Sequence, residues 1–211
     1  VRIPSARGDY NDLAQAHGLD RVKFEILNMG LGLTKNPIRN MVKDPPPKVW
    51  LVDNLLEKSK PAILAAIGGV GKSMMALDLA VKISQGGGEW FGHSINRGGN
   101  VVVISAEDDL NEIHRRIKAL DPQDKRFTAP YDVYTYTIPD SPEPLILIKD
   151  DKNGLSITPK AQELLAELEQ IPNLELVVID PIQAVSAAPI SSSNEAAQLY
   201  CQLCASISSR F

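Results

Sequence analysis

The chain has 211 residues, a hydrophobic fraction of 44% and a formal net charge of −4. This length allows one full α/β domain with a small attached unit; the sequence has neither a signal peptide nor an apolar run near the ~18 residues that a membrane span needs, so we expect a soluble, cytoplasmic protein. The negative net charge excludes a general electrostatic attraction to nucleic acid, which leaves only a local surface for such binding.

Residues 1–33 are predicted to form two short helices separated near Gly18, too short to hold a core of their own. The string Gly-Asp-Tyr-Asn-Asp-Leu at residues 8–13 resembles the end of the Toprim domain in plasmid and phage primases. That resemblance implies an acidic metal-binding cluster upstream of Val1, and the missing initiator methionine suggests a fragment of a longer polypeptide. An ordinary helical N-terminal extension is the alternative.

Residues 34–48 are predicted to be a linker that joins two domains. The run of three prolines at residues 45–47 resists helix and sheet alike and acts as a semi-rigid spacer. We therefore place a domain boundary here and a second domain at residues 49–211. Trp50, at the start of that domain, is interpreted as a packing residue and not as a base-stacking one.

A glycine-rich turn follows an apolar run at residues 62–66, which we predict to be the first strand of the core. A polyphosphate needs converging backbone N–H groups with no bulky side chains in the way, and Gly68, Gly69 and Gly71 meet that need. Residues 74–83 have apolar side chains at helical spacing. A helix that begins here would direct its positive dipole end at the anion.

The turn ends in Gly-Lys-Ser, the end of the pattern G-x-x-x-x-G-K-[ST]. Lys72 is predicted to reach the β- and γ-phosphates and Ser73 to give its hydroxyl to Mg²⁺, and Val70 and Met74 complete the predicted nucleotide-binding set. The first glycine of the pattern is replaced by Ala66. The alternative is a glycine-rich turn that binds nothing.

Residues 101–106 contain four consecutive branched residues, so we predict a strand buried on both faces and hence a parallel sheet covered by helices. Ligands of such sheets bind beyond the carboxyl ends of the strands, and we therefore predict that Glu107 is the general base that activates the attacking water. Asp108 and Asp109 can cap the next helix, expected at residues 110–120. The alternative is that all three acids only cap the helix. Residues 90–93 are expected to form a loop under the sheet.

Residues 121–158 contain two further strand candidates, at residues 133–137 and 145–148. An amphipathic helix is predicted at residues 159–171, followed by an apolar strand at residues 174–180 that ends in Asp180. An aspartate in this position, after a phosphate-binding turn, is predicted to hold the water shell of Mg²⁺ opposite Ser73.

The end of the chain is predicted to be a small-residue loop and a helix at about residues 195–209. Cys201 and Cys204 form a C-x-x-C pair, but no second pair exists and zinc needs four ligands. We interpret both as members of the buried face of a helix in a reducing compartment. A further strand is expected after this helix, so the core is expected to be incomplete at the C-terminus.

The order of these parts resembles the ATPase core of the RecA-like superfamily, most closely the RepA-type hexameric replicative helicases of plasmids and phages, over about residues 48–211. The resemblance implies ATP, Mg²⁺, a homo-hexamer with ATP at subunit interfaces, and movement on single-stranded DNA. It also implies that Lys72 and Ser73 bind phosphate and metal, that Glu107 is catalytic and Asp180 metal-associated, and that Arg116 lies against the adenine. With the Toprim-like segment, the parent polypeptide would be a primase-helicase.

Three other functions remain open. A RecA-like recombination or regulatory ATPase would share every motif of the core. A small-molecule P-loop kinase would need an arginine-rich lid, whereas residues 121–158 contain only Arg126. A nucleotide-dependent assembly module without strand separation is the third.

Overall fold

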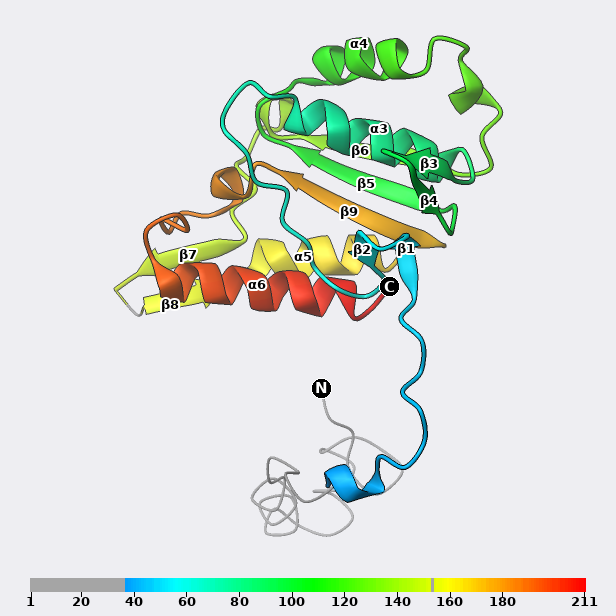
Figure 1. The fold of residues 1–211 in the computed structure, drawn as a ribbon. Coiled ribbons are helices and arrows are strands. Elements are labelled where there is room, and N and C mark those ends of the chain that lie inside the picture. The colour runs from blue at the N-terminus through cyan, green and yellow to red at the C-terminus, as the bar shows by residue number, and fades with distance from the viewer. Residues whose placement is uncertain (1–36, 153) are drawn as a thin grey trace, which may run out of the picture. The chain divides into compact units, whose positions relative to one another are not determined.

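The computed structural model describes residues 37–152 and 154–211 (Figure 1). The chain divides into two compact units, Val1–Pro47 and Lys48–Phe211. The two helices predicted within residues 1–33 lie outside the described residues. The described part of the first unit contains a short 3-10 helix, η1 (Ile38–Asn40), followed by exposed residues without regular structure.

The second unit is built on a three-stranded parallel sheet in the order β6-β5-β9. β5 (Asn100–Ser105) lies between β6 (Val133–Thr137) and β9 (Leu174–Asp180) and is buried along its whole length. The three strands agree with the sequence prediction to within one residue at each end. The predicted parallel sheet is confirmed, because a strand of branched residues is stable when both of its faces are covered.

Helices cover both faces of this sheet (Figure 1). α3 (Lys72–Ser84) and α4 (Leu110–Leu120) lie on one face, and α5 (Pro159–Leu168) and α6 (Asn194–Ser208) lie on the other. Because successive strand residues point to opposite faces, β5 contributes Val101 and Val103 to the core under α3 and α4, and Val102 and Ile104 to the core over α5 and α6. The four predicted helices are confirmed, although α5 ends three residues earlier than expected.

Two antiparallel sheets accompany the parallel one, so the predicted mainly parallel sheet describes only part of the fold. β1 (Trp50–Val52), β2 (Leu56–Glu57), β3 (Gly88–Trp90) and β4 (His93–Ile95) form a sheet in the order β2-β1-β4-β3. The loop predicted at residues 90–93 is therefore confirmed only for Phe91 and Gly92, which form the tight turn of a hairpin and have positive φ. Trp90 and His93 belong to the strands of this hairpin, which are too short to show an alternating pattern.

The second antiparallel sheet is the hairpin of β7 (Ile148–Asp151) and β8 (Gly154–Ile157). The strand predicted at residues 145–148 is wrong except for Ile148, which begins β7. Leu145, Leu147 and Ile148 are nevertheless buried in the core with α5 and α6, because an apolar run is buried for its hydrophobicity whether or not it forms a ladder.

The strand predicted at residues 62–66 is also wrong. Residues 60–67 have no regular structure, and the side chains of Ile63 and Ile67 are 70% and 79% exposed. β9 is an edge strand of the parallel sheet. Residues 62–66 therefore form no ladder with β9 or with any other strand of the described sheets. Three of these five residues are alanine, which is depleted in strands because it offers little side-chain surface for packing.

Candidate functional site

The glycine-rich turn leads directly into α3, as the sequence predicts. Gly71 precedes the helix with a φ of 90°, and Gly69 has a φ of 79°. These left-handed conformations favour glycine. No heavy atom lies within 4 Å of the position that a Cβ would take at Gly68, Gly69 or Gly71. The turn is therefore open on its outer side and leaves room for an anion at the helix N-terminus.

The ammonium group of Lys72 lies within this turn. Its Nζ donates to the carbonyl oxygens of Ala66 at 3.1 Å and Ile67 at 3.0 Å, and both bonds are exposed to solvent. Such bonds exchange readily with water or a ligand. Phosphate oxygens could replace the two carbonyl oxygens as acceptors for this ammonium group. Val70 is exposed beside the turn, and Met74 is half-buried in the first turn of α3.

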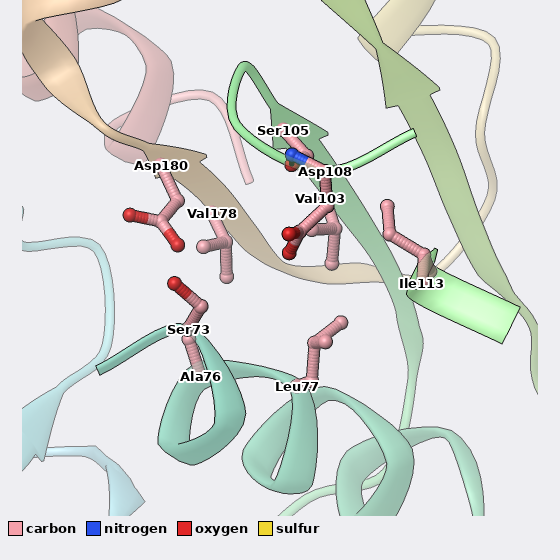
Figure 2. A pocket seen from close by; sticks show the side chains of 9 residues that line it. All are labelled: Ser73, Ala76, Leu77, Val103, Ser105, Asp108, Ile113, Val178 and Asp180. Carbon is pink, nitrogen blue, oxygen red and sulfur yellow. Dashed lines mark hydrogen bonds between the residues drawn. The ribbon is translucent and has the colours of Figure 1, made fainter. Parts of the chain in front are cut away.

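A small pocket lies where α3 begins and where β5 and β9 end (Figure 2). The hydroxyl of Ser73 and the carboxylate of Asp180 point toward each other, and the carboxylate of Asp108 points into the same space from the loop after β5. The remaining lining side chains are mostly apolar: Ala76, Leu77, Val103, Ser105, Ile113 and Val178. Three hard oxygen donors from three different elements thus meet in one pocket, a donor set that fits Mg²⁺.

The sheet register explains why these groups meet. Ser105, the last residue of β5, is the register partner of Asp180, the last residue of β9. Parallel strands that end at the same level bring the loops after them to one edge of the sheet. The predicted pairing of Ser73 with Asp180 at one site agrees with this geometry.

The three acids after β5 have different surroundings. Glu107 is exposed and lies outside the pocket lining, whereas Asp108 is only 9% exposed. Asp109 caps α4, because its side chain accepts a hydrogen bond from the N–H of Glu112 at 2.7 Å. The capping role is therefore confirmed for Asp109 and wrong for Asp108. Nothing in a run of three acids indicates which one turns inward, so sequence reasoning missed the position of Asp108.

Asp108 is held from two sides. Its Oδ2 is 2.6 Å from Nη1 of Arg116, and its backbone N–H donates to Oγ of Ser105 at 3.1 Å. Burial raises the pKa of the Asp108 carboxyl, the Arg116 guanidinium opposes this rise, and the carboxylates of Glu112, Asp180 and Glu107 add to it. A carboxylate in this position favours the approach of a further cation, because one guanidinium does not compensate all of these negative charges.

Arg116 itself lies on α4 and is partly buried. Besides Asp108, it contacts Glu112 through Nε at 3.1 Å. The structure thus places this predicted adenine contact next to the pocket, in an ion-pair network on α4.

The two cysteines of α6 differ in their surroundings. Cys204 is half-buried against the core, and burial raises the pKa of its thiol, which disfavours the reactive thiolate. Cys201 is exposed, so the buried-face interpretation fails for it. Among residues 37–152 and 154–211, no group of three potential metal-binding His, Cys, Asp or Glu side chains is present.

One comparison with known proteins bears on this site. Residues 32–209 match the model of a family described as AAA domain. In the described part of the chain, no helix is both long and apolar enough to cross a membrane.

Proposed function

This chain belongs to the AAA domain family, and from that premise we propose that it is the ATP-hydrolysing motor core of a replicative DNA helicase. Membership makes the chain a P-loop ATPase domain of the AAA type, and the general activity of such a domain is nucleotide hydrolysis. The helicase role is the more specific part of the proposal. It rests on the similarity of the motif order to the RepA-type helicases.

The convergence of Ser73 and Asp180 behind the open turn is the observation that carries the proposal. The backbone N–H groups of the turn and the ammonium of Lys72 would hold the phosphates of ATP. Ser73 and Asp180 would hold Mg²⁺ and its waters, and this ion neutralises charge that develops on the phosphates. Glu107 is the proposed general base. It would orient the attacking water, and Arg116 would lie near the adenine.

The proposed partners follow from the same similarity. We assign single-stranded DNA as the polymer that the motor moves on, a homo-hexamer as the assembly, and the cytoplasm as the compartment. The negative net charge requires that DNA contacts come from a local surface. The Toprim-like string near the N-terminus supports a primase-helicase as the parent polypeptide.

Calorimetry tests the nucleotide site. The chain should bind ATP in the presence of Mg²⁺, and Lys72→Ala should abolish binding because the phosphates lose their main positive charge. Lys82→Ala on the same helix is the matched control, since the side chain of Lys82 forms a partly exposed ion pair with Asp78. Equal ATP affinity of Lys72→Ala and the unchanged chain would refute the phosphate-binding assignment.

Hydrolysis assays test the proposed helicase role. Single-stranded DNA should increase the rate of ATP hydrolysis. Phosphate transfer to a small-molecule acceptor would favour the kinase. If the chain assembles in the presence of ATP and DNA does not change the rate of ATP hydrolysis, the assembly module is favoured.

A further inference from the structure

Asp108 has no role in the function proposed so far, yet its carboxylate faces the same pocket as Ser73 and Asp180 (Figure 2). Its side chain is 11% exposed. A buried carboxylate is costly unless it is paired. One partner, Arg116, is present, and the question is what the second oxygen of the carboxylate does.

The side chain of Asp108 is fixed in its orientation. Arg116 binds Oδ2 at 2.6 Å, and Glu112 in turn binds Arg116, so the guanidinium is held on α4. The backbone N–H of Asp108 is tied to Ser105 at the end of β5. The ion pair with Arg116 is made by Oδ2, and the carboxylate points into the pocket. This arrangement presents one oxygen to a ligand without the need for rearrangement.

We propose that Asp108 is a second magnesium-side carboxylate of the nucleotide site, which acts together with Ser73 and Asp180 on the water shell of the metal. The inference rests on the proposed function, because it takes Mg²⁺ to enter with ATP. Mg²⁺ retains several of its waters and binds proteins through a few hard oxygens. Two carboxylates that face one pocket repel each other, and a divalent cation between them removes that repulsion.

This role differs from that of Glu107. The general base acts on the attacking water, whereas Asp108 would position the metal and its waters. Loss of the Asp108 carboxylate should therefore raise the Mg²⁺ concentration that ATP binding requires. This effect can be measured without hydrolysis. The alternative is that Asp108 only forms a structural ion pair with Arg116.

The test is a Mg²⁺ titration of ATP binding by the full chain. Asp108→Asn should raise the Mg²⁺ concentration at half-saturation by about 10-fold or more, the range for residues that orient metal ligands. Asp180→Asn serves as the reference for a direct effect and should raise it as well. Asp109→Asn is the matched control, since it removes one negative charge from the neighbouring residue and keeps a capping side chain. It should leave the Mg²⁺ requirement unchanged.

A structural role is distinguished by thermal melting. If Asp108→Asn lowers the melting temperature but binds ATP with the Mg²⁺ requirement of the unchanged chain, Asp108 is structural and the inference is overturned. If Asp108→Asn does not fold, Asp108→Glu keeps the charge on a longer side chain. Its Mg²⁺ requirement should then rise, because the oxygen is displaced, and an unchanged value would overturn the inference.

The two proposals fail in different ways. Failure of the unchanged chain to bind ATP at any Mg²⁺ concentration would overturn both. Normal Mg²⁺-dependent binding by the unchanged chain and Asp108→Asn alike, with a raised requirement in Asp180→Asn, would overturn the role of Asp108 and leave the nucleotide site intact.

Discussion

Three consecutive acidic residues after β5 illustrate how neighbours of the same chemistry come to differ. Glu107 points to solvent, Asp108 turns into the pocket, and Asp109 caps α4. The start of α4 fixes Asp109, because a capping side chain must accept from an N–H in the first turn. Arg116 lies two helical turns further along α4 and forms an ion pair with Asp108.

Substitution of Glu107 tests the proposed general base. Glu107→Gln should leave ATP binding nearly intact and slow hydrolysis by about 10²-fold or more, the range for a positioned general base. Glutamine keeps the shape of the side chain but cannot accept the proton. The measurement is ATP turnover under conditions in which the proposed hexamer forms, paired with calorimetry.

The control for this substitution is Glu89→Gln, another exposed glutamate, on β3. It should hydrolyse ATP at the rate of the unchanged chain. Hydrolysis by Glu107→Gln at that same rate would show that the base is a different group.

At the scale of elements, the segment before β5 is packed tightly against the segment before β9. The carboxylate of Glu175 is 4% exposed and binds Lys58 at 2.9 Å and Arg97 at 3.2 Å. These ion pairs join the β1–β2 sheet, the turn before β5 and the start of β9. These ion pairs lie at the end of the sheet opposite the pocket, where they join the three segments.

Gly99 is the tightest point of this packing. A Cβ at residue 99 would lie 2.6 Å from the carbonyl oxygen of Asn173 and 2.3 Å from Cγ of Glu175. Neither neighbour can yield easily, since the first is backbone and the second is held by two cations. Gly99→Ala should therefore lower the free energy of unfolding by about 1–3 kcal/mol, the usual cost of overpacking, measured by urea denaturation.

Gly68→Ala is the control for that experiment. Its Cβ would meet no atom within 4 Å, so in the absence of nucleotide its free energy of unfolding should change by at most about 0.5 kcal/mol. Equal stability of Gly99→Ala and the unchanged chain would contradict the described packing of β5 against β9.

At the scale of the whole molecule, the division between Pro47 and Lys48 is the main feature. Residues 38–49 are all exposed, and the segment after η1 has no regular structure. Its prolines remove backbone donors, so neither a helix nor a sheet can absorb the segment. The domain boundary predicted at residues 34–48 can therefore be tested directly.

Limited proteolysis with trypsin should cut this segment first, after Arg39, Lys43 or Lys48. The expected product is a resistant fragment that starts near Val49, identified by mass spectrometry and N-terminal sequencing. Exposed segments without ladder hydrogen bonds are the preferred sites of cleavage. If the first cuts fall within α4, after Arg115, Arg116 or Lys118, while the three linker sites remain protected, the linker prediction is wrong.

Local patterns in the sequence were enough for the elements with strong signals. Four branched residues in succession predicted β5, an aspartate cap and helical spacing predicted α4, and an apolar run ending in Asp180 predicted β9. In each case the decisive interactions lie within the element or depend on burial of both faces of a strand. The glycine-rich turn was also predicted, because glycines followed by Gly-Lys-Ser form the pattern of a phosphate-binding turn.

Tertiary structure decided the rest. Whether residues 62–66 form a strand depends on a partner edge, and no property of the run itself supplies one. The sheet that contains β3 and β4 also depends on β1, which pairs with β4 across a long stretch of sequence. The inward turn of Asp108 depends on Arg116 and on the level at which β5 and β9 end together. The sequence by itself thus predicted a set of candidate groups for the chemistry, and only the packing of distant elements decided which of them share a pocket, because contacts between such elements leave no local pattern.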